Sequence, residues 1–128
     1  MTVYPYKADR GLFFPVVRFS LIFKNTKIVI EALVDSGASI SVFSADVAEV
    51  LGIKVESGKR TSLGGVGGSI VGYEHQVELA IAQLRTFATV VFSKQYKIGF
   101  NLIGRQDVFD KFTICFNEKR KQLELKSS

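Results

Sequence analysis

The sequence has a single cysteine, Cys115, and a single histidine, His75, among its 128 residues. One cysteine excludes an intrachain disulfide, which favours a reducing compartment and predicts a cytoplasmic location. We expect Cys115, between Ile114 and Phe116, to be a buried and inert thiol. His75 has no second ligand at metal spacing, so we expect a surface or partly buried side chain and no metal site.

Long hydrophobic runs are also missing. No stretch is long enough to span a membrane, and we expect no membrane partner. Residues 1–7 lack the apolar run of a secretory signal, and Met1 favours an intact start. Because the chain has no internal repeat, low-complexity tract or linker, we expect one domain over residues 1–128.

The formal net charge of +5 comes partly from a basic cluster at residues 119–121 and from Lys126. No aromatic residues alternate with this cluster, and no nucleic-acid-binding motif surrounds it. We therefore expect a solvated turn and tail rather than a nucleic-acid partner.

Strand patterns dominate the rest of the chain. Between Phe13 and Phe23, Val17, Phe19 and Leu21 alternate with polar residues, and a turn at residues 24–26 predicts a hairpin with residues 27–34. Further strands are expected at residues 40–43, 59–63, 69–82, 85–92, 100–105, 113–116 and 122–125. With 11 glycines and few helical patterns, the chain is predicted to be all-β.

One or two short helices complete the prediction. Ser44 is a suitable N-cap, and Gly52 a suitable C-cap, for a helix over residues 45–51 in which Val47, Val50 and Leu51 face the core. A second helical segment is expected at residues 106–112. Residues 1–11 are expected to form a loosely held arm, because a proline at position 5 disfavours strand pairing.

The sequence Val34-Asp35-Ser36-Gly37-Ala38-Ser39 follows the strand at residues 27–34. An acid thus stands at a strand end, followed by a hydroxyl and a glycine that permits a tight turn. Backbone amides of such a turn can point back at the carboxylate. A plain strand–turn with local hydrogen bonds is the alternative, because Asp-Ser-Gly alone is a common tripeptide.

Two further landmarks follow in order. Four glycines around one valine form a hairpin tip between two strands: Gly64, Gly65, Val66, Gly67 and Gly68. Two glycines would suffice for a plain turn, so four predict mobility or a close backbone approach. The third landmark is a late apolar strand that ends in glycine, Leu102-Ile103-Gly104-Arg105, with a short helix behind it.

These three landmarks, in this order and spacing, resemble the retropepsins, the single-domain aspartic proteases, over residues 16–116. The resemblance implies a closed-barrel-like fold in which Asp35 is catalytic and Ser36 hydrogen-bonds the two active-site loops together. It implies that Gly37 contacts the peptide, and that residues 64–68 are a flap with Gly65 and Val66 at its tip. No metal or cofactor is implied. We expect apolar pockets from Gly37, Ala38, Val66 and Ile103.

Two features differ from the retroviral members of that family. Those members usually carry acidic residues where this chain has Ser39 and Ile40, and one of them pairs with the arginine that matches Arg105. Here Arg105 needs another partner, such as Asp107, or remains solvated. The ends also differ, with a longer N-terminal arm and a charged C-terminal extension. The chain therefore resembles stand-alone cellular or prokaryotic relatives more than a viral enzyme.

Peptide hydrolysis of this kind needs two carboxylates, but the chain has only one Asp-Ser-Gly. Asp9, Asp46, Asp107 and Asp110 lack this context, so the second Asp35 must come from another copy of the chain. The resemblance thus predicts a homodimeric aspartic endopeptidase acting on an extended peptide or protein. The rival hypothesis is a dimerisation or peptide-binding module with little or no catalysis.

Other chemistries fit the sequence less well. Ser36, His75 and an aspartate could make a hydrolase triad, but no nucleophile elbow surrounds the serine. The glycine-rich segment lacks the Lys-Ser/Thr pair and the following helix of a phosphate-binding loop.

Overall fold

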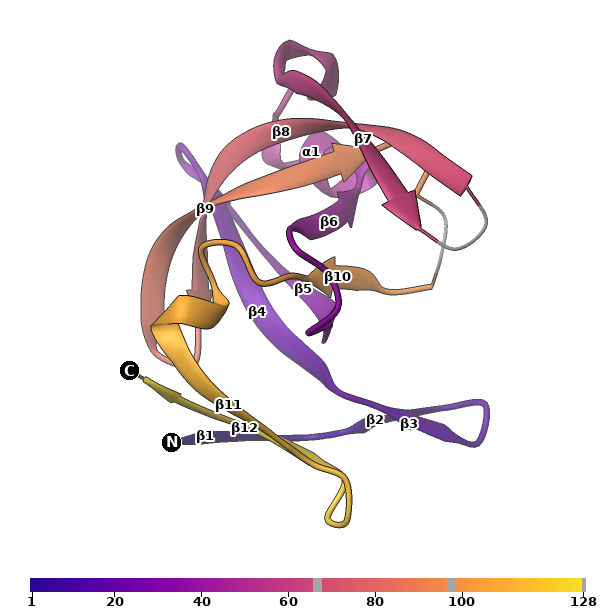
Figure 1. The fold of residues 1–128 in the computed structure, drawn as a ribbon. Coiled ribbons are helices and arrows are strands. Elements are labelled where there is room, and N and C mark those ends of the chain that lie inside the picture. Colours follow the sequence, from indigo (N-terminus) through magenta and orange to yellow (C-terminus); the bar gives the residue numbers. More distant parts are fainter. Residues whose placement is uncertain (66–67, 97–98, 128) are drawn as a thin grey trace.

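The computed structural model describes residues 1–65, 68–96 and 99–127, and they form a mainly β structure (Figure 1). One α-helix, α1 (Ala45–Leu51), and two 3₁₀ turns, η1 (Val55–Ser57) and η2 (Phe109–Lys111), interrupt the strands. The strands are β1 (Thr2–Pro5), β2 (Lys7–Asp9), β3 (Leu12–Phe14), β4 (Val16–Phe23), β5 (Thr26–Val34), β6 (Ser41–Ser44), β7 (Lys59–Gly65), β8 (Gly68–Ile81), β9 (Leu84–Ser93), β10 (Asn101–Ile103), β11 (Phe112–Asn117) and β12 (Gln122–Ser127).

The main sheet closes on itself. Its strand order is β4-β5-β10-β6-β9-β8-β7, and β4 also pairs with β8, which joins the first strand to the last but one. Closure leaves β7 as an extension that reaches beyond the barrel with the outer part of β8 (Figure 1). The prediction of an all-β, closed-barrel-like fold is therefore confirmed.

The predicted hairpin of β4 and β5 is present. Val16 pairs with Leu33 and Phe23 with Thr26, so β5 runs back along the whole length of β4. Val17, Phe19 and Leu21 are at most 3% exposed, whereas Arg18 faces outward, as their alternation predicts. Burial of this face fixes the register, because a slip by one residue would turn the apolar side chains into solvent. The hairpin thereby fixes the position of Asp35, which directly follows the last residue of β5.

Helix α1 has the predicted bounds, and Gly52 ends it with a left-handed backbone at φ 78°. Val47 and Leu51 are buried as expected, but Val50 is 63% exposed and the prediction for it is wrong. Ala48 is buried instead. The stripe 47, 48 and 51 is one face of a helix, and residue 50 lies to the side of it.

The N-terminal residues are not the loose arm that Pro5 suggested. Strand β1 pairs antiparallel with β12, which in turn pairs with β11, and the two chain ends lie side by side (Figure 1). Pro5 is tolerated because β1 is an edge strand and Pro5 is its last residue. Tyr6 is then buried and donates its backbone N–H to the carbonyl of Lys121 at 2.8 Å. Residues 7–14 continue as the β2–β3 hairpin.

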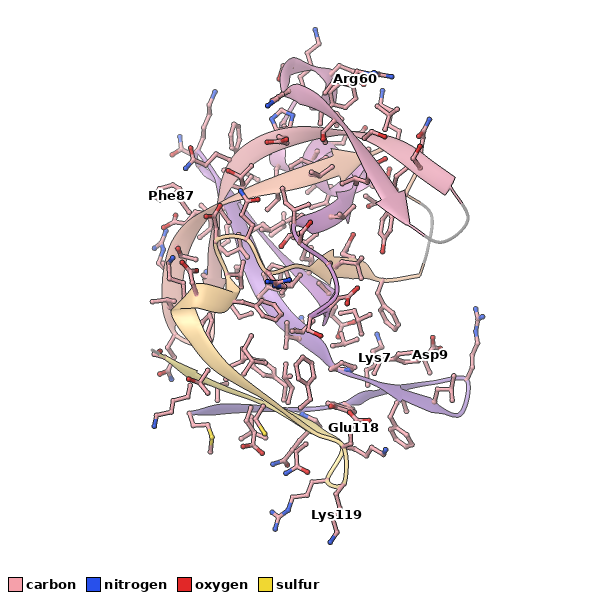
Figure 2. All side chains as sticks on the ribbon, in the orientation of Figure 1. Lys7, Asp9, Arg60, Phe87, Glu118 and Lys119 are labelled. Carbon is pink, nitrogen blue, oxygen red and sulfur yellow. The ribbon has the colours of Figure 1, made fainter. Side chains whose placement is uncertain are left out.

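Cys115 is exposed, contrary to the prediction of a buried thiol. On β11 the half-buried side chains are Ile114 and Phe116, and alternation turns Cys115 to the other face. The basic turn after β11 extends away from the body, with Lys119 pointing outward (Figure 2), which agrees with a solvated cluster. Within the described residues, no helix is long and apolar enough to cross a membrane.

Candidate active site

Asp35 is the first residue after β5, and the main chain holds it from two sides. Its backbone N–H donates to the carbonyl of Ile103 at 2.9 Å, so the parallel β5–β10 pairing fixes its position. Its carboxylate Oδ1 accepts the N–H of Gly37 at 2.9 Å. A Cβ at position 37 would lie 3.3 Å from the same Oδ1, closer than most such contacts. The predicted turn, with an amide directed at a half-buried carboxylate, is present.

The loop from Asp35 to β6 packs directly on the residues after β10. The N–H groups of Arg105 and Gln106 donate to the carbonyls of Ala38 and Ser39, each at 2.9 Å. At Gly104, an added Cβ would lie 2.4 Å from the carbonyl carbon and oxygen of Ile40. Gly104 therefore allows a backbone approach that no other residue permits.

Ser41 adds a buried anchor at this contact. Its side chain is fully buried, and its hydroxyl accepts the N–H of Gly104 at 3.0 Å. The hydrogen bond satisfies a polar group that has no access to water. The glycine-ended strand β10 therefore packs directly beside the aspartate loop.

Asp35 faces a cavity of about 540 Å³ between its own loop and the β7–β8 hairpin. The hairpin arches out from the barrel on the side of the loop after β5 (Figure 1). The lining residues come from the loop and β6 (Asp35, Gly37, Ala38, Ser39, Ile40 and Val42), from the hairpin (Leu63, Gly64, Gly68, Ser69 and Ile70), and from Tyr96 and Leu102. The cavity thus brings together two of the three sequence landmarks with a residue of the third.

The glycines near the hairpin tip lie on both strands. Gly65 pairs with Gly68 in the antiparallel register, and Gly68 has φ +121°, which favours glycine. A Cβ at Gly64 or Gly68 would meet nothing within 4 Å. Close packing therefore does not explain Gly64. Val66 and Gly67, predicted at the tip, lie outside the described residues.

The predicted pocket residues are only partly those that line the cavity. Gly37 and Ala38 line it, whereas Ile103, predicted to do so, is 1% exposed and lies in the barrel core. Leu102 lines the cavity instead, because neighbouring residues of a strand face opposite sides. The alternation of β10 could have given this assignment.

Tyr96 lines the same cavity, and its only signal in the sequence is an aromatic residue in a loop. Its hydroxyl donates to the carbonyl of Phe100 at 2.5 Å. Burial, and then the negative charge of Asp35, raise the pKa of the Tyr96 phenol. The phenol therefore stays neutral at ordinary pH and gives this wall a polar atom close to the carboxylate.

Asp107 is not the partner of Arg105. Its carboxylate Oδ2 accepts the N–H of Thr89 at 2.9 Å, and Arg105 is exposed, with no ion pair among the residues that the structure describes. Ser36 is also exposed, and its hydroxyl makes no hydrogen bond within the described ranges. Bonds between two active-site loops would need a second chain, so the predicted role of Ser36 stays a prediction.

Outside this cavity, the other candidate residues have structural surroundings. His75 is half-buried, and its Nε2 lies 2.7 Å from the carbonyl of Val55, which requires the ring to donate there. A second hollow of about 550 Å³ has Phe87 in its lining. Phe87 lies on the outside of the sheet (Figure 2). The only acid in the lining of this hollow, Glu78, is paired with Arg85. Across the described part of the chain, no three His, Cys, Asp or Glu residues form a cluster that could hold a metal.

Comparisons with known proteins agree with this geometry. Residues 22–104 match a family model described as aspartyl protease. No curated protein sequence matches the chain significantly. Among solved structures, a retropepsin-like aspartic protease from Rickettsia conorii aligns with a TM-score of 0.67 and 16% identity, over 96% of this chain and 98% of that one. The structural match shows a shared fold, and the family model spans more than half of the sequence. The chain therefore belongs to the aspartyl protease family and has a retropepsin-like fold.

Proposed function

We propose that the protein is an aspartic endopeptidase that works as a homodimer, with Asp35 of each subunit forming one catalytic pair. The observation that carries this proposal is the placement of Asp35. Its backbone is fixed by Ile103 and its carboxylate by the amide of Gly37, and it faces the cavity under the β7–β8 hairpin. A carboxylate held rigidly at the mouth of a peptide-sized cavity is what general acid–base hydrolysis requires.

The chemistry needs one ionised and one protonated carboxylate. The ionised one takes a proton from a water molecule while the water oxygen bonds to the scissile carbonyl carbon. The protonated one gives its proton to the carbonyl oxygen, which forms a neutral tetrahedral diol. The first carboxyl then protonates the amide nitrogen, the C–N bond breaks, and a diol hydroxyl returns a proton to the second. Two neighbouring carboxylates share a proton in this way because both cannot ionise cheaply, so they titrate as one unit.

One chain supplies only half of this pair. The cavity contains one carboxylate, Asp35, and none of the other aspartates lines it. A two-fold symmetric dimer that brings the two Asp35 residues together completes the site without a second motif. The exposure of Ser36 and Gly37 leaves that side of the loop free to meet the same loop of a second copy.

The substrate is proposed to be an extended peptide with apolar side chains near the cleaved bond. Apolar groups from Ile40, Val42, Leu63, Ile70 and Leu102 dominate the cavity lining. The outer strands of the hairpin offer backbone groups for strand-like pairing with a peptide. Tyr96 adds one hydroxyl to an otherwise apolar wall.

The proposal is tested by cleavage of a denatured protein pool at mildly acidic and neutral pH, with the wild type and Asp35→Asn side by side. Asp35→Asn keeps the shape of the side chain but cannot accept the proton from water. We expect cleavage by the wild type and a loss of at least about a hundredfold in the variant. Equal cleavage by both would exclude the aspartic mechanism. A dimeric wild type that cleaves nothing would favour a peptide-binding module.

A further inference from the structure

The side chains of Ser93 and Gln95 hold the outer part of β8, which still pairs with β7 but no longer with β9. Pairing between β8 and β9 stops at Tyr73 and Phe92. Two residues further along β8, the N–H of Val71 donates to Oε1 of Gln95 at 2.7 Å. The carbonyl of Val71 accepts the hydroxyl of Ser93 at 2.6 Å. We name these two contacts the Val71 clasp.

The clasp is built into the structure rather than a chance surface contact. Ser93 is 1% exposed, and its oxygen also accepts the N–H of Gln95 at 3.1 Å, so all three residues are linked. Gly72 is buried, and a Cβ there would lie 2.3 Å from Cγ1 of Val91. The glycine therefore lets β8 lie close enough to β9 for the two side chains to reach Val71.

The neighbours of the clasp residues line the cavity of Asp35. Ile70 precedes Val71 in the hairpin, and Tyr96 follows Gln95 in the segment after β9. Tyr96 is itself held by the hydrogen bond from its hydroxyl to the carbonyl of Phe100. Movement of the hairpin relative to the segment after β9 would change the width between Ile70 and Tyr96.

We infer that Gln95 is a positioning residue for substrate binding, which acts by holding the hairpin strand at Val71 against the wall that carries Tyr96. This inference rests on the proposed function, since it concerns the same cavity. Gln95 itself is exposed and does not line the cavity, so it acts through Val71. Loss of the contact should weaken peptide binding more than the chemical step.

The test compares Gln95→Met with Gln95→Glu. Methionine has a similar length but no oxygen, whereas glutamate keeps the acceptor for the Val71 N–H. Amide hydrogen exchange by NMR should be roughly three- to tenfold faster at Val71 in Gln95→Met, and KM should rise by a similar factor with kcat nearly unchanged. Gln95→Glu should match the wild type in the Val71 exchange rate and in KM. The wild type and the two variants should have the same unfolding midpoint.

Three results would overturn the inference. The first is an unchanged exchange rate of the Val71 amide in Gln95→Met. The second is faster exchange in that variant with an unchanged KM. The third is a rise in exchange rate and KM in Gln95→Glu as large as in Gln95→Met. A wild type that cleaves nothing would contradict the proposed function instead. The exchange comparison would still stand, and the affinity for an uncleaved peptide would take the place of KM.

Discussion

Gly104 shows how one residue determines the geometry of the aspartate loop. A Cβ at this position would lie 2.4 Å from the backbone of Ile40, and backbone cannot move away as a flexible side chain can. We predict that Gly104→Ala lowers the free energy of unfolding by about 2 to 4 kcal/mol and reduces peptide cleavage, because the loop that carries Asp35 must shift. Urea denaturation and a cleavage assay would measure both effects.

Gly64→Ala is the matched control for this prediction. Gly64 lies on the same cavity, but a Cβ there would meet nothing within 4 Å. Its free energy of unfolding should stay within about 0.5 kcal/mol of the wild type. Similar losses in both variants would contradict the view that close packing requires glycine at position 104 but not at position 64.

Tyr6 gives a second prediction at the residue scale. Burial, followed by its hydrogen bond to Glu118, raises the pKa of Tyr6 from its ordinary value of 10.0 to about 12. The folded protein therefore keeps the phenol neutral after the unfolded chain has begun to release its proton. The stability that Tyr6 contributes is complete below about pH 10 and declines as the pH rises towards 12.

Tyr6→Phe removes the phenolic hydroxyl, and with it both the hydrogen bond to Glu118 and the ionisation of residue 6. At neutral pH the variant should be about 1 kcal/mol less stable, since it loses one hydrogen bond to a partly exposed acid. Above about pH 10 its free energy of unfolding should fall less steeply than that of the wild type. Urea denaturation at a series of pH values measures the free energy of unfolding of both proteins. The same pH dependence in the wild type and in Tyr6→Phe would contradict the raised pKa of Tyr6.

At the residue scale, the sequence predicted what depends on local pattern. The turn at Asp35 and the glycine at position 104 follow from short motifs. Cys115 was assigned to the wrong face because the prediction rested on its apolar neighbours, and Ile103 because strand alternation was not applied to β10. Gln95 bonds to Val71, 24 positions earlier, and the pKa of Tyr96 responds to the charge of Asp35, about 60 positions earlier; a single sequence contains no trace of such pairing.

At the scale of elements, the N-terminal strand β1 has a larger role than its proline suggests. It covers one edge of β12, whose Leu123 and Leu125 are at most 3% exposed. We predict that deletion of residues 1–5 lowers the free energy of unfolding by about 2 kcal/mol or more, because apolar side chains of this sheet become exposed. A thermal melt of the truncated chain is the measurement. An unchanged unfolding midpoint would instead support the loosely held N-terminal arm that the proline predicted.

The hairpins and the helix were predictable because their signals are local. The turn at residues 24–26 and the alternation around it define β4 and β5, and Gly52 marks the end of α1. The pairing of β1 with β12 was not predictable, because these strands lie at opposite ends of the chain and their contact depends on the whole fold. Pro5 misled the prediction, since its penalty applies to central strands and not to the last residue of an edge strand.

At the scale of the whole molecule, the single Asp-Ser-Gly motif makes activity depend on association in the proposed mechanism. If the Asp35 pair is shared, cleavage per subunit should fall on dilution below the dissociation constant of the dimer. A series of protein concentrations at fixed substrate, with sizing at each concentration, measures this. Constant activity per subunit in a range where the protein is monomeric would contradict a shared site.

The closed barrel and its family were predictable from three short motifs in order, because the fold requires each of them at one place. The way in which two copies meet was not predictable. Interface contacts depend on surfaces such as the exposed Ser36 loop, whose residues carry no periodic pattern.

The central claim is that two Asp35 side chains from different chains form one site, and subunit mixing tests it most directly. Wild type is incubated with an equal amount of Asp35→Asn until subunits exchange, and cleavage is compared with the same wild type alone. Random exchange leaves about half of the wild-type activity, since mixed dimers have one competent carboxylate. Undiminished activity, with exchange confirmed by mass labelling, would contradict the shared site.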